Sequence, residues 1–278
     1  MLAGNLPATL IRPPQGWAAL ELRELWGYRD LLFLFVWRDL KIRYKQTFLG
    51  IAWAVLNPFI AMVVFTFLFG HVARVPSEGI PYPVFAYSAL IPWTYFVTTL
   101  TQSTDSVVKH SALVSAVYFP RLILPLSSVV PGLVDLAIAF VMLIVLMLFY
   151  GVMPTAALWT LPFFILLAMA TALAGGLWAS ALNVEYRDVG FVVVPFLTQL
   201  GLFVTPVAYS SSLVPEPWRI VYSLNPMVGV VEGFRWALLG KAPPSGTLLL
   251  VSVLAVVGLL VSGLYYFRWK EETFADVV

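Results

Sequence analysis

The chain has 278 residues, of which 61% are hydrophobic and only 11% are charged, whereas an ordinary soluble domain carries about 25% charged residues. With a mean hydropathy of +0.91, this composition excludes a soluble globular enzyme and predicts an all-α integral membrane protein with several spans. A net charge of +2 gives no reason to expect nucleic acid as a partner, and the absence of cysteine excludes disulfides, thiolate nucleophiles and zinc–sulfur sites.

Residues 1–24 are expected to form an N-terminal cytoplasmic tail, and the first thirty residues show no basic-then-apolar pattern of a cleaved signal peptide. Residues 25–49 are predicted to form an amphipathic helix in the membrane interface, in which cations flank an apolar stripe with a 3.6-residue period. The alternative is an ordinary cluster of positive charge before a first span. The stripe consists of Phe33, Val36, Trp37, Leu40, Tyr44 and Phe48.

Residues 50–268 are expected to form a membrane domain of six spans, since a span requires about 20 apolar residues. The small pair Gly175–Gly176 indicates a place where two helices approach closely. Residues 269–278 would form a cytoplasmic C-terminal tail. The six predicted spans cover residues 51–71, 84–104, 122–150, 158–182, 189–209 and 247–267.

The distribution of lysine and arginine predicts the orientation of these spans, because cytoplasmic loops carry an excess of both. If the N-terminus is cytoplasmic, only four of the 16 Lys and Arg residues fall on the outer side of the membrane. These four are Arg74, Arg219, Arg235 and Lys241. Both termini are therefore predicted to be cytoplasmic.

The outer segment 210–246 contains signals for two short helices at about 215–240. Pro217 suits the first residue of one helix, and Asn225 with Pro226 suits the cap and first residue of the next. Gly240 is expected to end the second helix. Both helices are too short to span, so we expect them to be re-entrant or to lie on the outer leaflet; a small packed extracellular cap is the alternative.

Catalytic chemistry and metal binding are not expected. The two histidines, His71 and His110, fall on predicted opposite sides of the membrane, and the chain contains neither a phosphate-binding P-loop nor an H-E-x-x-H motif. Asp135 is the single carboxylate well inside a predicted span, where a charge is costly. Because no cation lies in the core of another span, we interpret Asp135 as structural, hydrogen-bonded to a neighbouring helix or near the cytoplasmic end of its segment, rather than as an ion-coupling residue.

Four segments together resemble the ABC type-2 permeases that export polysaccharides. They are RDLKIRYKQTFLGIAWAVLNP at 38–58, NVEYRDV at 183–189, TPVAY at 205–209, and SLNPM at 223–227 followed by EGFRWALLG. Their order and spacing extend over nearly the whole chain after residue 30. The combination is similar to the Wzm-like permeases of O-antigen and related lipopolysaccharide exporters, with capsule and teichoic-acid permeases as near relatives.

The resemblance implies a homodimer of six-span subunits in a bacterial inner membrane, bound to two copies of a separate ATPase. It implies no cofactor in this chain, because ATP and Mg²⁺ are held by the ATPase. The implied cargo is a glycan on a polyprenyl diphosphate carrier, which passes between the two copies. A coupling helix at about 105–118 would contact the ATPase.

The same resemblance suggests roles for three sets of residues. Contact with membrane lipid or the diphosphate is expected from Trp37, Arg38, Lys41, Arg43 and Lys45. Coupling to the ATPase is expected from Asp105, Lys109, His110, Tyr186, Arg187 and Asp188. Channel lining is expected from Trp53, Trp93, Tyr95, Phe96, Phe203 and Tyr209, although aromatic residues of membrane proteins also form interface belts and cores.

Three other functions remain open at this point. An ion-coupled secondary transporter would require internal repeats and charges at the membrane midplane, and a membrane-bound transferase would require a clustered base or nucleophile. An ABC exporter of capsular polysaccharide, teichoic acid, a drug or another lipid would share the fold, because fold does not determine cargo.

Overall fold

The computed structural model describes residues 22–45, 50–240 and 243–277. Within these ranges every regular element is a helix, which agrees with the all-α prediction. The tail at 1–21, and with it most of the predicted cytoplasmic tail, lies outside the described residues, as do Phe48 and Lys241.

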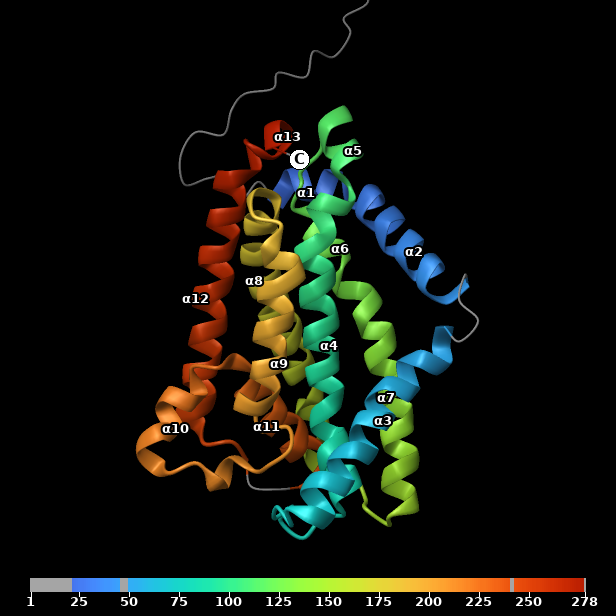
Figure 1. Ribbon diagram of the computed structural model, residues 1–278, viewed down its shortest axis with the longest axis vertical. Coiled ribbons are helices and arrows are strands. Elements are labelled where there is room, and N and C mark those ends of the chain that lie inside the picture. Colours follow the sequence, from blue (N-terminus) through green and yellow to red (C-terminus); the bar gives the residue numbers. More distant parts are fainter. Residues whose placement is uncertain (1–21, 46–49, 241–242, 278) are drawn as a thin grey trace, which may run out of the picture.

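The helices form an elongated bundle, and most of the longer helices run along its long axis (Figure 1). They are α1 (Leu22–Gly27), α2 (Arg29–Lys45), α3 (Gly50–Phe65), the π-helix η1 (Thr66–Val72), α4 (Tyr82–Lys109), α5 (Ser111–Ala116), α6 (Ile123–Ser127), α7 (Val129–Phe149), the 3₁₀-helix η2 (Ala156–Thr160), α8 (Leu161–Glu185), the π-helix η3 (Val189–Val193), α9 (Val194–Val204), the 3₁₀-helix η4 (Ser211–Leu213), α10 (Glu216–Ser223), α11 (Pro226–Leu239), α12 (Gly246–Glu271) and α13 (Phe274–Val277).

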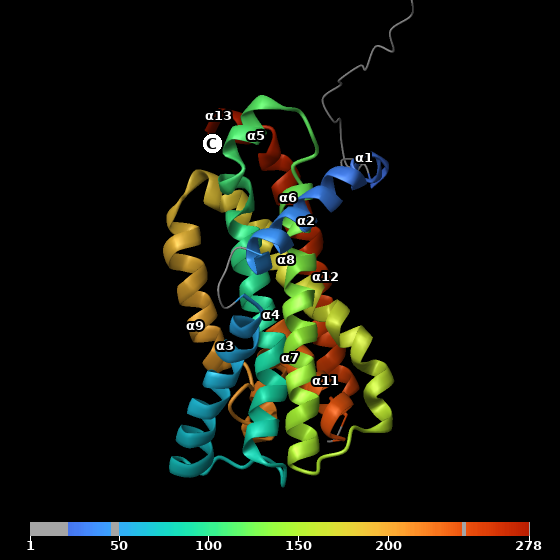
Figure 2. The same cartoon turned by 90° about the vertical axis from the view of Figure 1, so that its right-hand side faces the viewer.

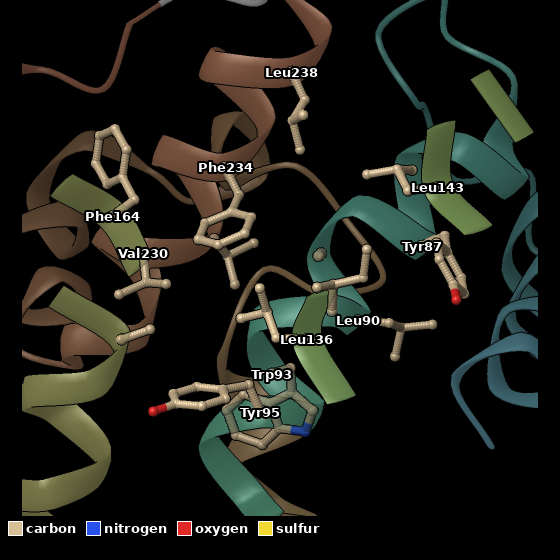
Figure 3. Packing of buried hydrophobic residues seen from close by; sticks show 14 of the residues in the cluster. Tyr87, Leu90, Trp93, Tyr95, Leu136, Leu143, Phe164, Val230, Phe234 and Leu238 are labelled. Atoms are coloured by element: carbon tan, nitrogen blue, oxygen red, sulfur yellow. The ribbon is translucent and has the colours of Figure 1, made fainter. Parts of the chain in front are cut away.

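α4 is the central helix of the bundle and packs against α3, α7, α8 and α11. Figure 3 shows side chains of α4, including Tyr87, Leu90 and Trp93, among residues of α7, α8 and α11. The α4–α8 contact is close, because a Cβ atom at Gly176 would overlap Ser103. The predicted close approach at the Gly175–Gly176 pair is therefore confirmed.

Four helical segments of the described chain are long and apolar enough to cross a membrane: Val55–Val72, Ile123–Phe149, Ala156–Glu185 and Gly246–Glu271. α4 is not among them, although its 28 residues correspond to about 42 Å of helix. The hydroxyl-bearing residues near its end, such as Ser103 and Thr104, lower its hydropathy, but they are buried against other helices instead of facing lipid.

The fifth predicted span is shorter than expected. The apolar helical segment there is Val189–Val204, whereas the sequence predicted a helix to residue 209. The helix ends because Thr205 precedes Pro206 and has extended backbone angles (φ −89°, ψ 145°), as the residue before a proline usually does. Tyr209 consequently lies in the turn after α9.

The two short helices before the last span are present, and their capping signals are confirmed. The side chain of Asn225 accepts a hydrogen bond from the backbone N–H of Met227 at 3.1 Å, and Gly240 ends α11 with φ +67°. α10 begins at Glu216, so Pro217 is its second residue. α11 is buried along most of its length against α4, α8 and α12, so it belongs to the core.

The predicted coupling segment at 105–118 contains the end of α4, a break at His110 and the short helix α5. α4 continues to Lys109, His110 interrupts the helix with φ −109° and ψ 21°, and α5 forms a separate short helix. The imidazole of His110 bonds back to the carbonyl of Ser106, so its side chain competes with continued helical bonding at this point.

Candidate functional site

α2 slants across the bundle from α1 towards α3 (Figure 1), and its faces differ from the predicted ones. The stripe is divided: Val36 is buried against the protein, whereas Phe33 and Trp37 are exposed and stack with 6.5 Å between ring centroids. Arg38 and Arg43, expected among lipid headgroups, are instead partly buried and contact the bundle. The helix turns these two arginines inward because the bundle supplies polar partners for both.

Asp135 of α7 is the first of these partners. Its Oδ2 lies 2.6 Å from the Nη2 of Arg43, and its Oδ1 accepts a hydrogen bond from the Tyr44 hydroxyl at 2.5 Å. Two consecutive residues of α2 therefore hold both oxygens of one carboxylate. The expectation that Asp135 bonds to a neighbouring helix is confirmed, and the cation that the sequence did not reveal comes from α2. Burial, and next the bond to Asp135, raise the pKa of Tyr44 well above its ordinary value, so the phenol keeps the proton that it donates.

His110 is the second partner. Its Nε2 lies 2.5 Å from the Nη2 of Arg38, and its Nδ1 lies 2.6 Å from the carbonyl oxygen of Ser106. Because a guanidinium can only donate and a carbonyl can only accept, the two contacts together require a neutral imidazole with its proton on Nδ1. Burial first, and the positive charge of Arg38 after it, lower the pKa of His110. Arg38 also pairs with Asp39 at 2.7 Å.

The ends of α4 and α8 are joined through Asn183, for which the sequence predicted no role of its own. Its Nδ2 donates to the carbonyl of Thr104 at 3.2 Å, and its Oδ1 accepts from the backbone N–H of Gly190 at 2.8 Å. A Cβ atom at Gly190 would come within 2.9 Å of the Asp105 carboxylate, so the absence of a side chain permits this close approach. A buried asparagine at the end of an apolar span is the signal that could have drawn attention to it.

The residues predicted to couple to an ATPase lie at this same end of the molecule, near α5 (Figure 1). Asp105 and Lys109 form an ion pair at 3.2 Å, one turn apart on α4. His110 follows them and faces α2. Tyr186, Arg187 and Asp188 are exposed in the turn after α8. A further ion pair between Lys270 and Glu185, at 2.6 Å, joins the end of α12 to the end of α8.

The aromatic residues predicted to line a channel fall into two groups. Trp93 and Tyr95 are only 6% and 2% exposed and lie in the core of the subunit (Figure 3). Trp53 and Phe203, in contrast, are exposed on α3 and α9. Phe96 is partly buried beside Trp93, and the Tyr209 hydroxyl lies 3.0 Å from that of Tyr222. In this conformation the exposed residues among the six predicted to line a channel therefore lie on α3 and α9.

α3 and α9 lie on the same side of the bundle (Figure 2), and each packs against α4. Together they present an apolar surface, which we call the α3–α9 face. It consists of Trp53, Leu56, Ile60, Val63, Val64 and Phe67 on α3 and η1, and of Phe196, Leu197, Leu200, Phe203 and Val204 on α9.

Comparison with known proteins places this arrangement among membrane transport components. The sequence profile described as ABC-2 type transporter matches residues 30–239. An O-antigen export system permease protein, RfbA, of Myxococcus xanthus is 32% identical over 92% of this chain and 98% of its own length. RfbA of Klebsiella pneumoniae is 28% identical over 94% of this chain and 100% of its own length. The polysialic acid transport protein KpsM of Escherichia coli is 24% identical over 87% of this chain and 93% of its own length.

Proposed function

The chain belongs to the ABC-2 type transporter family, and from this premise we propose that it is the membrane permease of an ATP-driven exporter of an O-antigen-like polysaccharide. The observation that carries the proposal is the similarity to O-antigen permeases over more than nine-tenths of the chain. The chain is then a transport subunit and not an enzyme. The proposed location is the bacterial inner membrane, with both termini in the cytoplasm.

The working unit in this proposal is a homodimer whose subunits each cross the membrane six times, with α4 and α9 as the two crossings additional to the four long apolar segments. The α3–α9 face supports the proposed homodimer, since this face is apolar and lies beside the buried α4. A second copy placed against this face would enclose a conduit, and Trp53 and Phe203 would line it. Aromatic rings can stack against the apolar faces of sugars, which suits passage of a glycan.

Two ATPase subunits would bind ATP and Mg²⁺ and dock at the end formed by α5 and the α8–η3 turn. The exposed Tyr186, Arg187 and Asp188 are available there. Asn183 fastens this turn to α4, so a push on the turn would be transmitted to the central helix. Closure of the ATPases on ATP would thus move the spans as rigid bodies.

The cargo in this proposal is a glycan carried on polyprenyl diphosphate, which would approach along α2. Lys41 and Lys45 are exposed there for contact with lipid headgroups or the diphosphate, and Trp37 is exposed beside them. Arg38 and Arg43 already bind protein groups, so they would reach a diphosphate only by exchanging those partners.

The test is purification in mild detergent from native membranes, followed by reconstitution into vesicles. We expect a soluble ATPase to remain bound at one copy per permease, and lipid-linked glycan to cross only when ATP is supplied. Arg187→Ala, in the docking turn, should reduce the ATPase that is retained, whereas the exposed Arg74→Ala on the predicted outer side should not. A permease that is isolated alone and moves solutes down an ion gradient would contradict the proposal and favour a secondary transporter.

Export of a capsular polysaccharide is the second candidate, favoured by the similarity to the polysialic acid transport protein KpsM. Teichoic acid and other lipids remain related possibilities. Offering O-antigen-type and capsule-type lipid-linked glycans to the same vesicles would distinguish between these cargoes.

A further inference from the structure

A polar cavity of about 270 Å³ lies at the end of the bundle that carries α10 and α11, far from α5 and α13. It opens between α10, α11, the start of α12 and the loop before α4. Its polar wall is formed by Glu78, Ser210, Ser211, Arg219, Glu232 and Arg235.

Arg235 is the most deeply buried group of this wall, with only 5% of its surface exposed. Its Nη atoms donate to the carbonyl oxygens of Val207 and Tyr209 at 2.8 and 2.9 Å, and its guanidinium lies 3.6 Å from the ring centroid of Phe85. Its Nε is buried and has no hydrogen-bond partner among the described residues. The side chain is therefore fixed in place with one donor unused.

Glu232 supplies an unused acceptor one turn away on the same helix. Its side chain lines the cavity and is partly buried, yet no hydrogen bond or ion pair joins its carboxylate to another residue in the described part of the chain. Its carboxylate is therefore accessible to a partner that enters the cavity. A ligand that both donates to Glu232 and accepts from the partly exposed Arg219 would contact the two charged groups at once.

The charges around the cavity identify the chemical class of that ligand. Two carboxylates, Glu78 and Glu232, balance two guanidinium groups, Arg219 and Arg235, so neither an anion nor a cation is favoured. A hydroxyl group donates one hydrogen bond and accepts others, and a ring with neighbouring hydroxyls matches adjacent acceptors and donors.

The size and the apolar part of the wall agree with a single sugar ring. Pro243, Pro244 and Leu248 offer apolar contacts for its C–H faces. The volume of about 270 Å³ is slightly below the roughly 300–1,000 Å³ of sites for drug-sized ligands, so it suits one ring and not an extended chain.

We propose that this cavity is a saccharide-binding site that holds one neutral sugar residue of the glycan as it leaves the permease. The inference rests on the proposed export of polysaccharide and on the predicted outer location of α10 and α11. Glu232 accepts hydrogen bonds from the sugar hydroxyls, and Arg219 donates to them, while Arg235, bonded to the carbonyls of Val207 and Tyr209, fixes the wall behind them.

The experiment measures binding of methyl glycosides of neutral hexoses to the full-length permease in detergent, by calorimetry and saturation-transfer NMR. Ser211→Trp fills the cavity without a change of charge, and Leu213→Trp places the same bulk on an exposed residue of the same short helix. Glu232→Gln removes the acceptor charge, and Glu272→Gln makes the same change at an exposed position just after α12, away from the cavity.

We expect at least one methyl glycoside to bind wild-type permease with a dissociation constant on the order of 1 mM. Ser211→Trp and Glu232→Gln should weaken it by about tenfold or more, while Leu213→Trp and Glu272→Gln leave it unchanged. The inference is overturned if no glycoside binds, if Ser211→Trp binds as well as wild type, or if pyrophosphate or Ca²⁺ occupies the cavity in preference.

The two proposals fail in different assays. ATP-dependent glycan export by a permease that binds no glycoside would leave the proposed function standing and remove the saccharide site. Conversely, binding that follows the pattern of the variants in a permease that exports no glycan would keep the site and refute the proposed cargo.

Discussion

α2 and α11 are both helices that the sequence placed at the periphery, and they are held in opposite ways. α11 is buried among α4, α8 and α12 by apolar side chains, with Val230, Val231 and Phe234 fully enclosed. α2 buries only Phe35 and Val36 and adds polar contacts to the bundle through Arg38 and Arg43. Apolar packing is lost only when a helix leaves its neighbours, whereas an ion pair can exchange one partner for another. α2 is therefore suited to move and α11 to stay.

The largest effect that tests this comparison is expected from Phe234→Ala on α11. The side chain is completely buried and packs in the main core (Figure 3), so its removal should lower the free energy of unfolding by about 3–5 kcal/mol. Phe33→Ala on α2 removes the same side chain from an exposed position, and the cost there should stay within about 0.5 kcal/mol. Thermal unfolding in detergent, followed by circular dichroism, measures both; equal effects would refute the contrast between the helices.

A smaller effect should follow from Asp135→Asn, which takes the carboxylate away from Arg43 and keeps a polar group near Tyr44. Because the side chains of Arg43 and Asp135 are 28% and 17% exposed, we expect a cost of about 1–3 kcal/mol, below that of breaking a fully buried pair. The double variant Arg43→Gln with Asp135→Asn should cost less than the sum of the single variants.

The position of α2 provides a second measurement for the same variant. The chain has no cysteine, so spin labels on introduced cysteines at the exposed Ile42 and Val141 would report the α2–α7 distance alone. We expect Asp135→Asn to broaden or lengthen this distance while α11 stays in place. An unchanged distance would show that the ion pair does not hold α2.

A further, still smaller effect concerns pH and the Arg38–His110 contact. The pKa of His110 is lowered in the folded protein, so the unfolded chain binds a proton more readily. Neutral His110 therefore makes its full contribution to stability when the pH is above the pKa of the unfolded state, about 6.5. This contribution declines as the pH falls from there towards the lower pKa of the folded state. His110→Gln should reduce the difference in melting temperature between pH 8 and pH 5.5; an identical difference in both proteins would contradict this interpretation.

The smallest effect on stability is expected from Lys41→Gln and Lys45→Gln. Both lysines are exposed on α2, so the free energy of unfolding should change by less than about 0.5 kcal/mol. Each change should nevertheless weaken retention of anionic lipid by up to about fivefold, since a basic residue near an anionic surface contributes about 1 kcal/mol. Native mass spectrometry would count the retained phosphatidylglycerol, with Arg74→Gln as the matched control on the predicted outer side.

Much of the molecule was predictable from the sequence because the signals concerned are local. The apolar segments, the Asn225 cap and the Gly240 stop each depend on residues within a few positions of one another. The family resemblance was likewise carried by continuous segments. The end of α9 was missed although the signal was present, since Pro206 restricts the residue before it.

The candidate site could be predicted only in part, because its contacts join residues far apart in the chain. Arg43 and Tyr44 meet Asp135 across 91 residues or more, and Arg38 meets His110 across 72. The sequence identified Asp135 as unusual but could not show its partner, since the tilt and rotation of α2 are set by packing and not by its own periodicity.

The sequence by itself therefore determined that this is a helical membrane protein of the ABC-2 type, with its short helices and their caps, since composition, periodicity and capping act along the chain. The tertiary structure decided which faces of the helices are inside. It turned Trp93 and Tyr95 into the core, made α11 a core helix, turned two arginines of α2 towards the bundle and assembled the polar cavity around Arg235. These features depend on the free energy of packing distant segments together, which no single segment encodes.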